Sequence, residues 1–227
     1  LKIMSVAIAV VLWLIVVNID NPTGTNYYTL NDVELINKEY VESSDTIGKM
    51  CMPEQNQDSI KVAITATKKI RDKIKVTDIS AVADLQQAVS LDTNPVMVPI
   101  TVTCSVPGVS PSDIKVTPQN LSVNLDEKET QEFVVNVSRG DTKPGKDYEV
   151  GSLTASPEKV RITGPKTLIN KIDKVNASIE LDGNTEDFTQ DVSLTIIDKN
   201  QEVLTDSEMN SLRIENNAKV TVTAKLW

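Results

Sequence analysis

The sequence contains no histidine, the residue that serves most often as a general base and as a metal ligand. A Ser-His-Asp triad is therefore impossible, and the sequence has no Gly-x-Ser-x-Gly, His-Glu-x-x-His or P-loop motif. The acidic group Asp182, Asn184, Glu186 and Asp187 lacks the glycine and the glutamate spacing of a calcium loop, so a solvated turn is the favoured interpretation. We expect a protein that is not an enzyme and has no metal or cofactor site.

Basic residues, aromatic residues and cysteines are also scarce. There are 23 Lys and Arg against 32 Asp and Glu, a formal net charge of −9. This balance excludes the basic surface of a nucleic-acid-binding protein and electrostatic attachment to anionic lipids. Aromatics make up 4% of the chain, so a core must consist of Val, Ile and Leu. The two cysteines, Cys51 and Cys104, could form one disulfide. Cys104 lies in an alternating strand pattern, which favours a buried thiol instead.

One long apolar run stands at the start of the chain, in residues 1–17, "LKIMSVAIAVVLWLIVV". As a helix it would be roughly 25 Å long, slightly less than a hydrocarbon core about 30 Å thick. The chain begins with Leu, and we expect a few preceding residues to complete the span. The run lacks a polar face and is followed by no small-residue cleavage site or lipobox cysteine. An uncleaved transmembrane signal anchor is therefore favoured over a cleaved signal peptide or a buried helix.

The charges around this run predict its orientation. Lys2 lies at the N-terminal end of the run and Asp20 is the first charge after it, so the N-terminus is expected in the cytoplasm and the bulk of the chain outside. Ser5 and Ala9 form a small-xxx-small pair of the kind that lets helices pack closely in lipid. The expected partner-binding stripe consists of Ser5, Ala9, Leu12, Trp13 and Val16. Two alternatives to partner binding stay open. Ser5 and Ala9 are small residues that the helix simply tolerates, or Trp13 anchors the helix at the membrane interface.

Beyond residue 26 the apolar residues alternate, which predicts half-buried β-strands. Short helical turns are expected at "KKIRDKI" (68–74) and "KTLINKI" (166–172), and no long amphipathic helix is present. The expected strands include "LSVNL" (121–125), "FVVNV" (133–137), "VRI" (160–162), "VSLTI" (192–196) and "VTVTAKL" (220–226). The Gly, Pro, Asn and Asp-rich connections between them are residues 106–113, 139–147, 181–187 and 198–202.

The chain also repeats itself. "KVAITATKKIRDKI" (61–74) and "KVRITGPKTLINKI" (159–172) share seven of fourteen residues, and "ISAVADL" (79–85) echoes "VNASIEL" (175–181). A repeat of roughly 90–100 residues has the size of a domain. The Gly-Pro pair at Gly164 predicts a turn with positive φ, which Ala66 in the first copy could not adopt as easily.

These patterns predict an all-β protein with two tandem β-rich domains in line after one transmembrane helix. The predicted organisation is a signal anchor at 1–17, a juxtamembrane linker at 18–26, and repeats at 27–125 and 126–227. The charged segment 126–131 is expected to connect the two repeats.

The anchor "LKxxSxxxAxxLWxxV" together with the repeat "V-x-I-T-G-P-x-x-x-I-x-x-I-x-x-V-x-A-x-I-x-L" resembles the YbbR-like family over essentially the whole chain, with the first copy the poorer match. The resemblance implies a single-pass membrane protein of Gram-positive bacteria with extracytoplasmic, cradle-like all-β repeats. It also implies binding to, and regulation of, the membrane diadenylate cyclase of CdaA type, which makes cyclic di-AMP. Members often carry more than two repeats.

With almost nothing predicted inside the cell, such a regulator could act only through the membrane or on an outer segment of its partner. The alternative is an extracytoplasmic adhesion or spacer protein of β-sandwich repeats with no role in cyclic di-AMP signalling. The sequence identifies no small-molecule ligand, and the direction of regulation and the external stimulus stay open.

Overall fold

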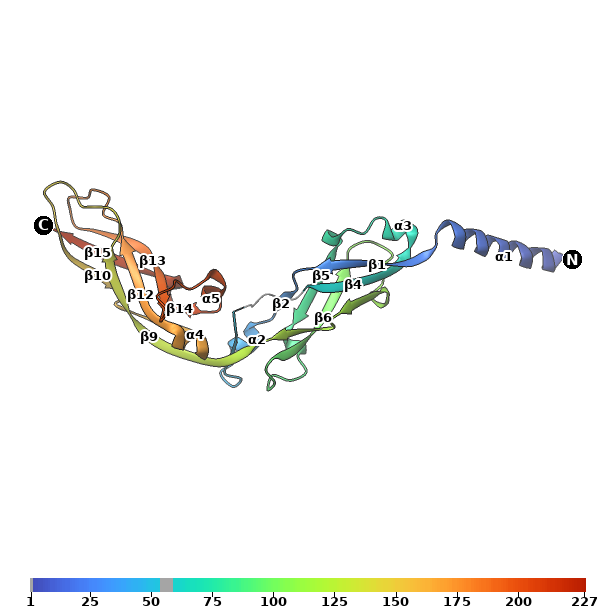
Figure 1. Ribbon diagram of the computed structural model, residues 1–227, viewed down its shortest axis with the longest axis horizontal. Helices are drawn as coiled ribbons and strands as arrows, with labels where there is room; N and C mark the ends of the chain where they lie inside the picture. The colour runs from blue at the N-terminus through green and yellow to red at the C-terminus, as the bar shows by residue number, and fades with distance from the viewer. Residues whose placement is uncertain (1, 54–58) are drawn as a thin grey trace. The chain divides into compact units, whose positions relative to one another are not determined.

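The computed structural model describes residues 2–53 and 59–227, and the side chains of Lys2, Ile3, Val17, Asn18 and Asp20 lie outside that description, as does all of Leu1. The chain divides into two compact units, Leu1–Tyr40 with Gln55–Val123, and Val41–Glu54 with Asn124–Trp227. Each unit is described by itself (Figure 1). The described part is mostly β-strand, as the alternating sequence predicts.

Helix α1 (Lys2–Asp20) contains the long apolar run as one uninterrupted helix. All of its large apolar side chains from Met4 to Val16, and Ile19, are between 49% and 75% exposed. Among the described residues, no helix combines the length and the apolar character required for a membrane span. Of the predicted linker 18–26, the first residues belong to α1 and the last to strand β1.

The first unit contains two separate sheets, with strand orders β1-β4-β7 and β2-β5-β6-β8. The predicted alternation is clear in β4, where Ile60, Val62, Ile64 and Ala66 are buried and the residues between them are not. Its strands are β1 (Thr23–Leu30), β2 (Glu34–Ile36), β4 (Ile60–Thr67), β5 (Ile79–Asp84), β6 (Val96–Cys104), β7 (Ile114–Thr117) and β8 (Asn120–Val123). Its helices are α3 (Lys68–Arg71) and the 3₁₀ turns η1 (Val76–Asp78), η2 (Leu85–Gln87) and η3 (Pro111–Asp113).

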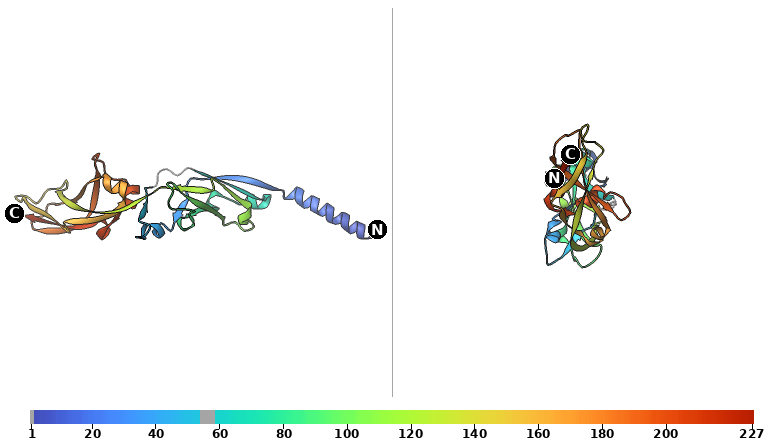
Figure 2. Two further views of the ribbon diagram at one scale, coloured as in Figure 1. Left: turned by 90° about the horizontal axis from the view of Figure 1, so that it is seen from below. Right: turned by 90° about the vertical axis from the view of Figure 1, so that its left-hand side faces the viewer.

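The second unit has one sheet in the order β10-β15-β13-β12-β9-β11-β14, with β3 also paired to β9. Its strands, coloured yellow-green to red except for β3, can be followed in Figures 1 and 2. They are β3 (Lys49–Cys51), β9 (Leu125–Arg139), β10 (Val150–Ser156), β11 (Lys159–Pro165), β12 (Ile172–Ile179), β13 (Phe188–Asp198), β14 (Arg213–Ile214) and β15 (Lys219–Leu226). Its helices are α2 (Glu39–Glu42, whose last two residues lie in this unit), α4 (Lys166–Lys171), α5 (Asp206–Asn210) and the turn η4 (Glu215–Ala218).

The core of the second unit is aliphatic, as the low aromatic content predicts. Phe133 and Phe188 lie at its edge and are only partly buried. The residues that are least exposed within it are Val160, Ile162, Ile169, Val175, Ala177, Ile179, Leu181, Ile196, Val222 and Ala224.

Both units share one pattern of strand pairing. In the first, β4 pairs antiparallel with β1 and β7, β5 pairs parallel with β2 and antiparallel with β6, and β6 pairs antiparallel with β8. In the second, β11, β12 and β13 make the same five pairings with β9, β14 and β15. The one long strand β9 takes the places of both β1 and β2. The two copies of the sequence repeat therefore have the same strand topology. That both units are YbbR-like domains stays a prediction.

Two features differ from the sequence-based expectation. Residues 126–131, predicted as a connector, lie inside β9, where they pair with β3 and β11. The segment Val41–Glu54 belongs to the second unit although it lies within the first repeat of the sequence. Val41, Met50 and Cys51 of this segment are buried.

Gly164 does not adopt the predicted positive φ. It lies in strand β11, and the described glycines with positive φ are at other positions. A Cβ atom at Gly164 would collide with the Leu212 side chain, so this position requires glycine for close packing. Ala66, at the matching position of β4, is likewise extended and buried. Cys104, predicted as a buried thiol, is only half-buried at the end of β6.

Candidate functional site

The predicted partner-binding stripe lies entirely on α1. At about 100° per residue, Ser5, Ala9, Leu12, Trp13 and Val16 fall within an arc of roughly 100° on one face of the helix. Leu12, Trp13 and Val16 are 56%, 63% and 61% exposed, and Ser5 and Ala9 are also exposed. The structure therefore places the five side chains together on an accessible face. Their role in binding a partner stays a prediction.

A carboxylate at the end of a parallel strand anchors a loop in each unit. Glu180 follows β12 and accepts hydrogen bonds from the backbone N–H (3.0 Å) and the hydroxyl (2.6 Å) of Thr142. Asp84 ends β5 and accepts one from the Asn37 side-chain amide at 2.8 Å. The hydroxyl of Thr142 lowers the pKa of Glu180, and the amide of Asn37 lowers that of Asp84. The echo between residues 79–85 and 175–181 aligns these two carboxylates.

An ionic network ties α4, β13 and α5 together in the second unit. The Lys171 amine lies 2.7 Å from Glu208 and 3.3 Å from Asp198. Asp198 is fully buried and also accepts hydrogen bonds from the N–H groups of Asn200 (2.8 Å) and Glu202 (2.9 Å). The Glu202 N–H, with the Lys171 amine, lowers the pKa of Asp198, while the Glu208 carboxylate raises the pKa of Lys171. Every polar group here is paired, which identifies a structural network rather than a reactive one.

The start of α4 is fixed by β9. Asp126 accepts a hydrogen bond from the Thr167 N–H at 2.7 Å, and Lys166 donates one to Glu127 at 2.6 Å. Burial raises the pKa of Asp126, but the bonds from Thr167 outweigh burial and set that pKa below its ordinary value. The charged segment 126–131 therefore holds the short helix of the repeated motif, a role that no sequence pattern predicted.

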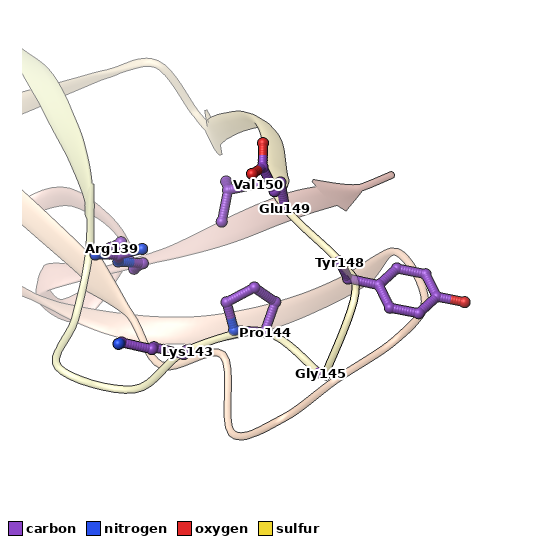
Figure 3. Close-up of a pocket in the computed structure, with 7 residues that line it drawn as sticks. All are labelled: Arg139, Lys143, Pro144, Gly145, Tyr148, Glu149 and Val150. Carbon is purple, nitrogen blue, oxygen red and sulfur yellow. The ribbon is translucent and has the colours of Figure 1, made fainter.

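The second unit has a hollow of about 600 Å³ at the end where β9 turns into β10, here called the loop-end hollow. Figure 3 shows the basic side chains of Arg139 and Lys143 on the same side of it, and the Tyr148 ring directed away. Its lining residues are Arg139, Lys143, Pro144, Gly145, Tyr148, Glu149 and Val150. The sequence predicted a turn at 139–147 but no binding site there.

A second hollow of about 420 Å³ lies next to α5 and β14, and its lining residues are Met209, Asn210, Leu212, Arg213, Ile214, Asn217 and Ala218. The Arg213 guanidinium is 3.1 Å from Glu42 and so is already paired with a carboxylate of the segment Val41–Glu54. The two hollows therefore differ in the charge that they offer a ligand.

The acidic loop that the sequence raised as a weak calcium candidate has the form of a turn. Asp182 and Gly183 have φ values of 44° and 76°, and Asp187 accepts a hydrogen bond from the Leu226 N–H at 2.8 Å. Within residues 2–53 and 59–227, no three Cys, Asp or Glu side chains gather as metal ligands would. Asp187 thus fixes the end of β15.

Comparison with known proteins identifies the class of the second unit. Residues 134–224 match the family model described as YbbR-like protein. A crystal structure of a YbbR-like protein from Streptococcus pneumoniae TIGR4 superposes with a TM-score of 0.50 at 16% identity, covering 90% of this chain and 96% of that one. At this identity the likeness concerns the fold alone.

A curated relative is more specific. Over 92 residues the chain is 32% identical to the CdaA regulatory protein CdaR of Bacillus subtilis (strain 168). The match covers 40% of this chain and 19% of that protein, so it spans about a fifth of the relative. The family resemblance drawn from the sequence is confirmed, and the part of the chain that matches the YbbR-like model is residues 134–224.

Proposed function

We propose that this chain is a membrane-anchored, non-enzymatic regulator that binds a membrane diadenylate cyclase of CdaA type and so controls the synthesis of cyclic di-AMP. The observation that carries the proposal is the 32% identity over 92 residues to the CdaA regulatory protein CdaR, beside the match of residues 134–224 to the YbbR-like family model. A regulatory family also fits a chain without histidine and without a nucleophile–base pair among its sequence motifs.

Membrane anchoring by α1 is part of the proposal. The large apolar side chains of α1 from Met4 to Val16, and Ile19, are 49–75% exposed and lie on all sides of the helix. Such a surface requires an apolar environment. In the proposed topology the N-terminus is cytoplasmic, and both β units are extracytoplasmic.

The proposed contact with the cyclase is made by the stripe Ser5, Ala9, Leu12, Trp13 and Val16. Small side chains at Ser5 and Ala9 permit close approach of a second helix in lipid, where packing rather than the hydrophobic effect drives association. Trp13 supplies the largest side chain of the stripe, at one edge of its arc. Regulation then requires that the cyclase have two states to which the bound helix has different affinities.

The test measures cyclic di-AMP in cells that express the cyclase with and without the full chain. The variant Ser5→Leu/Ala9→Leu adds bulk on the stripe, and Ala7→Leu/Val11→Leu adds bulk on the opposite face as a matched control. We expect a change in cyclic di-AMP that is lost in the first variant and kept in the control. Membrane yield of all three chains is compared by immunoblot.

The outcomes separate the two functions. A change that survives Ser5→Leu/Ala9→Leu would move the contact away from this stripe, while cyclase regulation would stand. Equal cyclic di-AMP with and without the chain, at normal membrane yield, would refute regulation and favour a cell-surface adhesion or spacer protein.

A further inference from the structure

The loop-end hollow contains two cations without counter-ions. Arg139, at the end of β9, and Lys143 both line it and are exposed. In the described part of the chain, neither side chain forms an ion pair with a carboxylate, in contrast to Arg213 in the second hollow. On a chain with nine excess negative charges, two unpaired cations that line one hollow give it a local positive charge.

The loop that carries Lys143 is held by the neighbouring loop between β12 and β13. The Gly183 N–H donates to the Lys143 carbonyl at 2.9 Å, and the Gly145 N–H donates to the Asn184 carbonyl at 2.8 Å. A Cβ atom at Gly145 would collide with Thr185, so the two loops are in close contact. The cations are thus presented by a backbone that is already fixed, which reduces the entropic cost of binding.

The far side of the hollow is fixed by the last strand. Glu149 and Trp227 exchange backbone hydrogen bonds at 2.9 and 3.1 Å. Figure 3 shows Glu149 across the hollow from Lys143, with Pro144 and Val150 between them. The lining therefore has a basic side, an apolar middle and one carboxylate.

From this arrangement we infer that the loop-end hollow binds a single oxyanion, a phosphate monoester, phosphodiester or carboxylate group, carried on a small uncharged body. The planar Arg139 guanidinium suits two-point contact with an oxyanion, and Lys143 adds a second positive charge. Glu149, together with Asp141 and Asp147 in the same loop, disfavours ligands with several anionic groups, such as polyphosphates. This binding is separate from the proposed contact of α1 with a cyclase.

The test is an NMR titration of the ¹⁵N-labelled full chain in a neutral detergent, following the amides of Gly145, Tyr148 and Val150. Three probes are titrated separately: inorganic phosphate, acetate, and glycerophosphoglycerol, which is the headgroup of phosphatidylglycerol. We expect saturable shifts of these amides at millimolar concentrations of at least one probe. The probe that binds most tightly distinguishes a free phosphate, a carboxylate and a lipid headgroup as the source.

The variants separate the hollow from general charge effects. Arg139→Gln should weaken binding about tenfold and Lys143→Gln about threefold, because each removes a charge-assisted contact at a partly solvated site. Glu149→Gln should strengthen binding about threefold by removing a repulsive charge. Lys146→Gln is the matched control, since Lys146 lies in the same loop but does not line the hollow.

All four side chains are exposed, so the variants are expected to fold, and unchanged amide positions outside the loop verify this. Shifts that do not saturate with any probe, or that are equal in Arg139→Gln and Lys146→Gln, would overturn the inference.

Discussion

At the scale of single residues, Gly164 shows how one position constrains the second unit. A Cβ atom there would meet the Leu212 side chain, and Ile169 lies at 3.4 Å. We expect Gly164→Ala to reduce the free energy of unfolding by about 1–3 kcal/mol, the usual cost of overpacking. Denaturant unfolding of Gly164→Ala, Leu212→Ala and the double variant measures the coupling. The cost of Gly164→Ala should be smaller in the Leu212→Ala background, and strict additivity would contradict the packing explanation.

The network of Lys171, Asp198 and Glu208 predicts a pH dependence of stability. The pKa values of Asp198 and Glu208 lie below their ordinary 3.8 and 4.5 in the folded chain. Their contribution is therefore present above those values and is lost as the pH falls through the lowered pKa. The pKa of Lys171 lies above its ordinary 10.5, so its contribution is present below 10.5 and is lost as the pH rises through the raised pKa.

We therefore expect the urea midpoint to be flat between about pH 6 and 9 and to fall on either side. Asp198→Asn should lower the plateau and make the acid decline shallower. An acid decline of unchanged steepness in Asp198→Asn would show that other carboxylates, such as Asp126 or Glu180, dominate it.

At the scale of elements, strand β3 connects the two halves of the sequence. Lys49, Met50 and Cys51 pair with Glu127, Asp126 and Leu125 of β9, and Met50 is 1% exposed. We expect Met50→Ala to destabilise the second unit by about 2–5 kcal/mol, as for other buried methionines. Met97→Ala is the matched control, because Met97 is 42% exposed on β6 and its truncation should cost much less.

Hydrogen exchange resolved by residue distinguishes the units in this experiment. In Met50→Ala, faster exchange should appear in the amides of β9 to β15, although residue 50 precedes β4 in the chain. Faster exchange confined to β4 to β8 would contradict the assignment of Val41–Glu54 to the second unit.

The strands of the sheets were largely predictable from the sequence, because alternation is a local signal. The predicted strands at 133–137, 160–162, 192–196 and 220–226 all lie within observed strands, and the two short helical turns are observed as α3 and α4. Residues 126–131 were predicted as a connector because a strand with polar side chains on both faces has the composition of a linker.

The assignment of Val41–Glu54 to the second unit could not be predicted. The alternation of apolar residues indicates a strand but does not indicate which of two sheets the strand joins. The loop-end hollow could not be predicted either. Its residues gather only through the backbone bonds of Lys143 with Gly183 and of Glu149 with Trp227. The stripe on α1, by contrast, follows directly from helical spacing.

At the scale of the whole molecule, α1 determines where the chain resides under the proposed function. We expect the full chain to sediment with membranes and to resist carbonate extraction, and a chain that starts at Asn21 to stay in the supernatant. Val10→Lys/Leu14→Lys keeps the length but places two charges in α1, each unfavourable by about 3 kcal/mol in a membrane. This variant should lose membrane association. Equal sedimentation of all three chains would argue against anchoring by α1.

The segment Val41–Glu54 also predicts how stable the second unit is when it is produced as a separate fragment. Residues 124–227 alone lack Val41–Glu54, and with it β3 and the partner of Arg213. We expect this fragment to unfold at a lower temperature than the second unit within the full chain. A peptide of residues 41–54, added in excess, should raise the midpoint by mass action. An unchanged midpoint would show that the segment contributes little stability.

The same segment has a consequence for the order in which the protein is made. The ribosome completes Val41–Glu54 about seventy residues before Asn124, the next part of the unit in which this segment is buried. At about 5–20 residues per second, this interval lasts on the order of 4–14 seconds. During that time Val41, Met50 and Cys51 lack the sheet that buries them, because strand β9, with which β3 pairs, has not yet been made. A newly made chain therefore presents a short apolar stretch to chaperones until its second half emerges.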